Sequence, residues 1–79
     1  MTLESLALGE RATITLVDWE RLAPEEGQRL RALGLDVGAE VTISHRGIFG
    51  GGDPIALKIG RMTVALRRAH AAAMSIEQV

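Results

Sequence analysis

The fold is decided by the stretch Pro54-Ile55-Ala56-Leu57-Lys58-Ile59-Gly60-Arg61-Met62-Thr63-Val64-Ala65-Leu66. Large apolar residues alternate with other residues on both sides of Gly60-Arg61, which predicts two strands joined by a tight turn. Pro54 stands at the first position of its strand, where a missing N–H is tolerated. The side chains expected to face the interior are Ile55, Leu57, Ile59, Met62, Val64 and Leu66. This alternation is typical of half-buried strands in an antiparallel sheet.

Three further strands are predicted outside this hairpin, at residues 12–17, 40–44 and 74–79. The first two alternate clearly, whereas the alternation of the last is imperfect. Residues 67–73 are rich in alanine and predict a single helical turn, and residues 3–8 predict a short turn that caps one end of the core. The expected inward residues of these segments are Leu3, Leu6, Leu8, Ala12, Ile14, Leu16, Val41, Ile43, Met74 and Ile76, and Val79 is a further apolar residue outside the alternation.

A short helix is predicted between the first two strands. Pro24 stands at its first position, Glu25 and Glu26 follow, and Gly34 lies just past its end. Gly27 inside the helix costs about 1 kcal/mol relative to alanine, so the helix can also begin after Gly27. Its core contacts are expected from Leu30, Leu33 and Leu35.

The expected fold is mainly β, a small SH3-like barrel of about five antiparallel strands with a short helix inserted after the first strand. Strands of this number and length cannot form two full stacked sheets, but they can curl around one shared interior. The chain has 79 residues and a mass of 8.5 kDa, which predicts a single domain over residues 1–79. A domain of this size buries only roughly 60% of the surface of its unfolded chain, which favours a binding module over an enzyme with an enclosed site.

The charge of the chain is small but unevenly distributed. The net charge of −1 and the pI of 6.1 disfavour a dedicated nucleic-acid binder. Residues 1–40 carry 4 arginines against 8 acidic residues, a sum of −4, and residues 41–79 carry 5 basic against 2 acidic residues, a sum of +3. These charges are either scattered for solubility or gathered on one surface, and the sequence leaves both readings open.

Several classes of site and location are disfavoured by composition. The chain has no cysteine, which excludes disulfides, thiolate metal sites and cysteine nucleophiles. The two histidines, His45 and His70, have no neighbouring ligands at metal-binding spacing and are expected on the surface, so no metal site is predicted. We also predict no catalytic site and no cofactor. A signal peptide or a membrane-spanning stretch is not evident, and a cytoplasmic location without membrane insertion is expected.

Two blocks of the sequence resemble the FeoA family. Arg29-Leu30-Arg31-Ala32-Leu33-Gly34-Leu35-Asp36-Val37-Gly38-Ala39-Glu40-Val41 is similar to the family pattern RL-x-x-LGL-x-x-G-x-x-V. Gly52-Asp53-Pro54-Ile55-Ala56-Leu57, followed by Val64-Ala65-Leu66-Arg67-Arg68 and Ile76-Glu77-Gln78-Val79, resembles the second half of the family, GDP-I-x-I … LR. The blocks cover most of the chain in the family's order. The loop Gly47-Ile48-Phe49-Gly50-Gly51 departs from the family, because it is longer and lacks a proline.

The resemblance implies an SH3-like barrel with a helical insertion and a small cytoplasmic accessory protein of ferrous iron transport. Its partner would be FeoB, the membrane ferrous iron transporter with a GTPase domain, whose assembly or activity FeoA proteins are thought to support. A related barrel forms the carboxy-terminal domain of iron-dependent repressors, so a metal-sensing regulatory domain is an alternative, as is a nucleic-acid-binding SH3-like module. Weak homo-oligomerisation stays open.

Six residues are candidates for binding a partner. Ile48 and Phe49 form an aliphatic-aromatic pair in a glycine-rich loop, which is typical of interaction sites when exposed, although burial over the barrel mouth is an equal alternative. Three arginines are candidates because together they could form a basic surface that attracts an acidic partner. The remaining candidates are Arg29, Leu33, Arg67 and Arg68.

Overall fold

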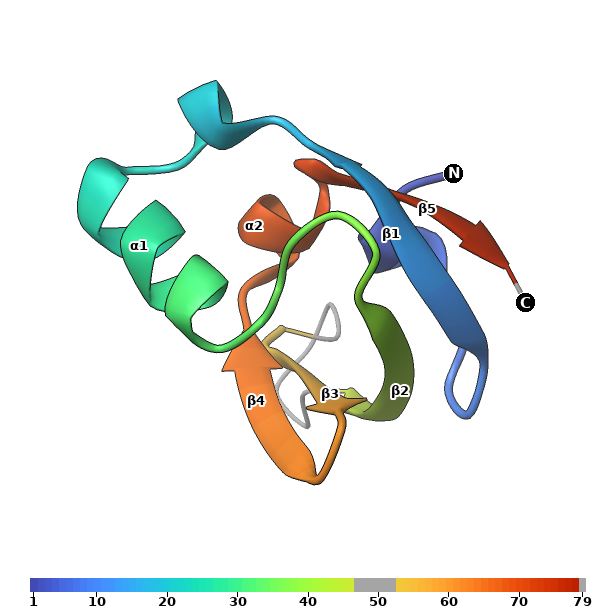
Figure 1. Cartoon of the computed structure of the whole chain (residues 1–79). Helices are drawn as coiled ribbons and strands as arrows, with labels where there is room; N and C mark the ends of the chain where they lie inside the picture. The colour runs from blue at the N-terminus through green and yellow to red at the C-terminus, as the bar shows by residue number, and fades with distance from the viewer. Residues whose placement is uncertain (47–52, 79) are drawn as a thin grey trace.

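The computed structural model describes residues 1–46 and 53–78 of the chain. Every predicted strand and helix is present (Figure 1). In chain order, the elements are the short 3₁₀ turn η1 (Leu3–Ser5), β1 (Arg11–Val17), the 3₁₀ turn η2 (Trp19–Arg21), α1 (Pro24–Ala32), β2 (Glu40–Arg46), β3 (Ile55–Ile59), β4 (Met62–Leu66), α2 (Arg68–Ala71) and β5 (Met74–Gln78).

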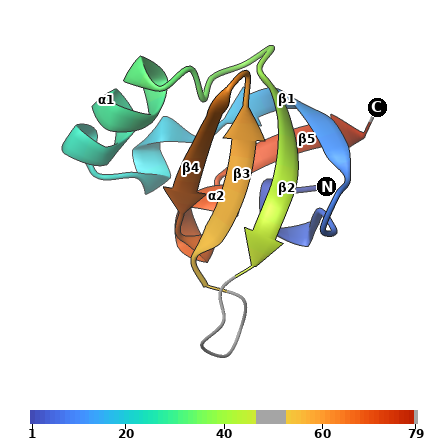
Figure 2. The same cartoon turned by 90° about the horizontal axis from the view of Figure 1, so that it is seen from below.

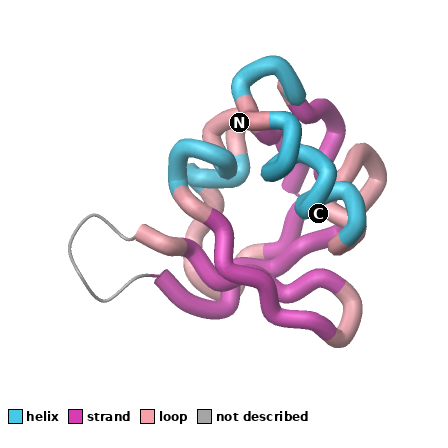
Figure 3. Tube along the Cα trace, turned by 90° about the vertical axis from the view of Figure 1, so that its left-hand side faces the viewer, coloured by secondary structure: helices cyan, strands magenta, loops and turns pink. Residues whose placement is uncertain are grey.

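The five strands form one antiparallel sheet in the order β4-β3-β2-β1-β5. Figure 2 shows how strongly the sheet curves, with β5 crossing behind β2 and β3. In Figure 3 the helical segments gather toward the top of the molecule, while most of the strand residues lie below them. This arrangement confirms the predicted SH3-like barrel with a helix inserted after its first strand.

One apolar core fills the barrel. Each fully buried aliphatic side chain in such a core contributes about 1.5–3 kcal/mol through the hydrophobic effect. Among the residues that the structure describes, no polar or charged residue is buried. The core consists of Leu3, Leu6, Ala12, Ile14, Val17, Leu22, Leu30, Leu35, Val41, Ile43, Ile55, Leu57, Val64, Leu66, Ala71, Ala73, Met74 and Ile76.

The prediction that Leu16 faces the core is wrong. Leu16 is 61% exposed, and its neighbour Val17 is buried instead. The pairing of β1 with β5 shifts register between Ile14 and Leu16. Such a bulge inserts one residue into the strand and reverses the faces of the residues that follow it.

Two more residues predicted to face the core, Met62 and Leu8, are exposed. Met62 is 45% exposed because it pairs with Ile59 beside the Gly60-Arg61 turn, where the hairpin extends past the core. Leu8 is 63% exposed and lies in the turn that follows η1, whereas Leu3 and Leu6 are fully buried as predicted.

The helix α1 begins at Pro24 and is not shortened by Gly27. The ring of Trp19 lies beside Gly27, where a Cβ atom would be 3.5 Å from Trp19 Cε3. The Arg31 guanidinium lies 4.1 Å from the centre of the same ring, at cation–π distance. Trp19 also packs against the core, so it links α1 to the barrel.

We expect alanine to destabilise the fold at only one of the two glycines near α1. Gly34 has a φ of +94°, and an added Cβ would lie 3.3 Å from Ile59 Cδ1, so Gly34→Ala should lower the free energy of unfolding by about 1–2 kcal/mol. Gly27→Ala should leave the free energy of unfolding unchanged or raise it by about 0.5–1 kcal/mol. Alanine favours the helix more than glycine does, and the added methyl group makes an ordinary contact with Trp19. Urea denaturation measures both values, and equal losses would contradict this view of α1.

Candidate partner-binding cleft

A cleft of about 380 Å³ lies between α1, α2 and the adjoining ends of β3 and β4. Two of the predicted partner-binding residues, Arg29 and Arg67, meet in it, although they are far apart in the sequence. The wall next to the sheet is formed by three residues, two before β3 and one in β4. The complete lining is Glu26, Arg29, Asp53, Pro54, Ala65, Arg67 and His70.

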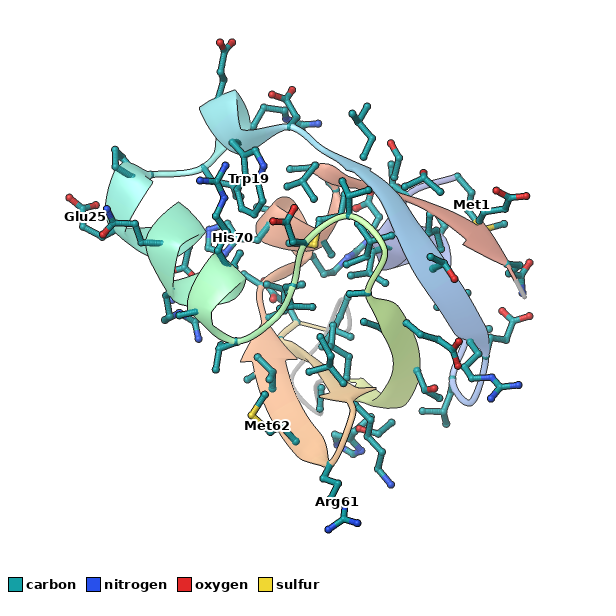
Figure 4. All side chains as sticks on the ribbon, viewed as in Figure 1. Met1, Trp19, Glu25, Arg61, Met62 and His70 are labelled. Atoms are coloured by element: carbon teal, nitrogen blue, oxygen red, sulfur yellow. The ribbon has the colours of Figure 1, made fainter. Side chains whose placement is uncertain are left out.

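The helical side of the cleft is built around the Glu26 carboxylate. Arg29 lies one turn further along α1 and donates from its Nε atom to Glu26 Oε1 at 3.1 Å, with a second hydrogen bond from Nη2. The same oxygen is 3.6 Å from Nδ1 of His70 in α2. The Nδ1 atom is buried and has no hydrogen-bond partner among the residues described. Figure 4 shows His70 between the ribbons of α1 and α2.

The pKa of Glu26 is lowered by its surroundings. The hydrogen bond from Arg29 is the main cause, and the charges of Arg29, His70 and Arg67 act in the same direction, whereas burial has an opposing effect. A carboxylate with a lowered pKa is held in its charged form. The cleft therefore keeps a fixed negative charge beside its arginines.

This lowered pKa predicts a pH-dependent difference between the wild type and Glu26→Gln. The pKa of Glu26 is lower in the folded protein than in the unfolded chain. At a pH above the unfolded pKa, the charged carboxylate therefore stabilises the fold. This stabilisation is lost as the pH falls through the folded pKa. We expect Glu26→Gln to be less stable than the wild type at pH 7 and equally stable in acid below both pKa values. Denaturation curves at a series of pH values measure the difference. A difference independent of pH would contradict the role of the Glu26 charge.

The side of the cleft next to the sheet is held by Asp53. Its Oδ1 atom accepts a hydrogen bond of 3.1 Å from the backbone N–H of Arg68, in the first turn of α2. This contact fastens the start of β3 to α2 and satisfies one of the free N–H groups of the helix end. Pro54 and Ala65 are exposed beside it and leave the cleft open.

The other candidate residues lie in different places. Arg68 is the first residue of α2, next to Arg67 in the sequence, and it is exposed. Leu33 ends α1 and is half-buried against the core, so it contributes to packing as well as to the surface. Ile48 and Phe49 lie outside the described residues, so their role stays a prediction.

His70, which was expected on the surface, is partly buried. Its side chain is 23% exposed, lines the cleft and lies against Glu26 of α1. His45 is exposed as predicted. Glu26 and Asp53 were not predicted from the sequence as parts of the site. The spacing of Glu26 and Arg29 on one helix face was a visible signal, but nothing in the sequence indicated that this face meets α2.

The positive charge of the second half of the chain lies mainly in and around β3, β4 and α2. Residues 53–73, which span these three elements, carry 4 basic side chains and 1 acidic side chain, a sum of +3. All four basic side chains are exposed. We call this surface the basic flank, and it consists of Lys58, Arg61, Arg67 and Arg68.

A comparison with protein-family models matches residues 1–78 to the FeoA domain. This chain belongs to the FeoA family. The match confirms the resemblance seen in the sequence and associates the chain with iron transport. The comparison with curated protein sequences finds no match.

Solved structures of FeoA proteins are similar to this chain over its whole length. FeoA from Chlorobium tepidum is 30% identical with a TM-score of 0.86, and the match covers 100% of this chain and 70% of that chain. FeoA from Stenotrophomonas maltophilia, a prokaryotic SH3 domain protein complexed with zinc, is 31% identical with a TM-score of 0.74 and coverages of 98% and 89%. Iron(II) transport protein A from Clostridium thermocellum is 30% identical with a TM-score of 0.84. This chain is fully covered but spans only 46% of that longer chain.

The same fold occurs in metal-dependent repressors. A manganese-dependent transcriptional repressor matches with a TM-score of 0.81 at 19% identity, and 41% of that chain is covered. This likeness shows a shared fold only. Within residues 1–46 and 53–78, no helix has the length and apolar character needed to cross a membrane. The same residues contain no group of three or more histidine, aspartate or glutamate side chains placed to hold a metal ion.

Proposed function

We propose that this protein is an accessory protein of ferrous iron transport that binds FeoB and supports its assembly or activity. The observation that carries the proposal is the FeoA domain match over residues 1–78. The FeoA protein from S. maltophilia, 31% identical, is described as a proposed activating factor of bacterial ferrous iron transport. We infer that the present chain acts by binding and performs no chemistry of its own.

The cleft is the proposed contact surface. Arg29 and Arg67 present guanidinium groups from two different elements to the same space. Arg29 is already paired with Glu26, whereas Arg67 forms no ion pair with any residue that the structure describes. An unpaired exposed arginine is suited to a carboxylate of a partner, which it attracts over a distance and holds with paired hydrogen bonds. Ile48 and Phe49 are proposed as additional apolar contacts.

Co-purification tests the proposal. The tagged protein is expressed with full-length FeoB from the same organism, and FeoB is extracted in detergent and recovered through the tag. The wild type should retain FeoB, and Arg29→Glu or Phe49→Ala should reduce its recovery while thermal unfolding shows that the domain is folded. Arg11→Glu is the control, because it makes the same charge change on β1, outside the cleft. Failure of the wild type to retain any FeoB would refute the proposal.

A further inference from the structure

The two edges of the sheet are covered to different degrees. At the β5 edge, the N-terminal segment lies alongside, because Ile76 N–H donates to the Met1 carbonyl at 2.9 Å and Thr2 forms a bridge with Ser75. β4 forms the other edge, and no segment among residues 1–46 and 53–78 pairs with its outer side. An edge strand with unpaired N–H and C=O groups is a template for another strand.

The register of the β3–β4 hairpin shows which backbone groups face outward. Ile59 pairs with Met62 across the Gly60-Arg61 turn, and Gly60 has a φ of +59°. These features fit a two-residue hairpin turn with glycine first, whose closing pair is hydrogen-bonded. Counting along β4 from this pair, the N–H and C=O groups of Thr63 and Ala65 point away from β3.

The charges around this edge are mostly positive. Arg61 precedes β4, and Arg67 and Arg68 follow it. Two acidic residues lie nearby: the carboxylate of Asp53 accepts a hydrogen bond from the N–H of Arg68, and Glu26, which lines the same cleft as Ala65, is paired with Arg29. Ala65 and Arg67 also line the cleft, so the outer edge of β4 opens into the candidate site. The edge thus combines free backbone groups with arginines at both of its ends.

We propose that β4 accepts an extended acidic segment of a partner protein as a sixth strand of the sheet. Backbone hydrogen bonds from Thr63 and Ala65 would hold the segment, while Arg61 and Arg67 bind its carboxylates. Backbone pairing supplies affinity without selecting a sequence, and the arginines supply the preference for acidic residues. This inference rests on the proposed function in one respect: FeoB is taken to be the protein that carries the acidic segment.

Amide hydrogen exchange of the full chain, with and without full-length FeoB in detergent, tests this inference residue by residue. In the free protein, the amides of Thr63 and Ala65 should exchange rapidly, because no hydrogen bond protects them, while those of Val64 and Leu66 should exchange slowly. With FeoB bound, exchange at Thr63 and Ala65 should slow by at least about tenfold. The amides of Val64 and Leu66 serve as the internal control for an intact hairpin.

The outcomes of the exchange measurement distinguish failure of strand addition from failure of the proposed function. If FeoB binds and the amides of Thr63 and Ala65 remain fast, strand addition is refuted while the proposed function stands. If FeoB does not bind, both are refuted. If these amides are protected in the free chain and the protein has the mass of a dimer, a second copy covers the edge and the acidic-segment proposal is refuted.

A variant of the edge gives a second test. Thr63→Pro removes an outward N–H that the β3–β4 pairing does not use, and edge strands tolerate proline at such positions. We expect at least about a tenfold loss of FeoB affinity, with the melting temperature within a few degrees of the wild type. Unchanged affinity in the folded variant would refute the proposal. If the variant fails to fold, exchange in the wild type still decides.

Discussion

Replacing Leu57 by alanine is expected to lower the free energy of unfolding by about 2–5 kcal/mol. Leu57 is fully buried in β3, where it lies between its cross-strand partners Ile43 in β2 and Val64 in β4. Alanine would leave a cavity in the centre of the core, because the neighbouring strands are fixed by their own pairing. A domain of 79 residues is stable by about 4–12 kcal/mol in total, so the variant loses a large share of its stability.

The matched control is Met62→Ala in the same hairpin. Met62 is 45% exposed, so its replacement should change the free energy of unfolding by only about 0.5 kcal/mol. Urea denaturation of both variants and the wild type measures the difference. For a domain of this size, the loss expected for Leu57→Ala corresponds to a fall in melting temperature of about 8 °C or more. If both variants lost the same small amount, the assignment of the barrel interior would be wrong.

Strand alternation was sufficient to predict the barrel but not the bulge. The alternation of residues 55–59 and 62–66 follows from the two-residue period of a strand, and it identified Ile55, Leu57, Val64 and Leu66 as core residues. The position of Leu16 could not be predicted, because the bulge depends on how β1 pairs with β5, about 60 residues away in the sequence. Such pairing is a property of the assembled sheet.

The candidate site was predicted only in part. Arg29 and Arg67 were identified from their charge and from the resemblance to the FeoA family, and the structure places both in one cleft. The contact between Glu26 and His70 was missed, because it depends on how α1 is placed relative to α2 in the folded chain. The uneven charge of the two halves of the sequence was visible, and the structure shows that the basic side chains of residues 58–68 are exposed.

Reversing the charge of Arg67 is expected to weaken FeoB binding by about ten- to a hundredfold, a loss of about 1.4–2.7 kcal/mol. With His70 neutral, the cleft carries Arg29 and Arg67 against Glu26 and Asp53, a sum of zero, and Arg67→Glu changes this sum to −2. An acidic partner segment would then meet repulsion. The fold should persist, because residue 67 is the N-cap of α2, where a negative charge is favourable.

The matched control for this variant is Arg11→Glu. Arg11 forms an ion pair with Glu40 at 3.4 Å, with both side chains more than half exposed, so its loss should cost little stability. It changes the net charge of the protein by the same amount as Arg67→Glu. A loss of affinity shared by both variants would indicate a general effect of net charge and not a contact in the cleft.

Binding of FeoB in the cleft is tested by the dissociation constant of the complex with full-length FeoB in detergent, measured for the wild type, Arg67→Glu and Arg11→Glu at low and moderate salt. We expect Arg67→Glu alone to weaken binding by at least about tenfold, and the wild-type affinity to fall as salt screens the basic flank. Equal affinities for all three proteins would contradict the claim that this cleft binds the transporter.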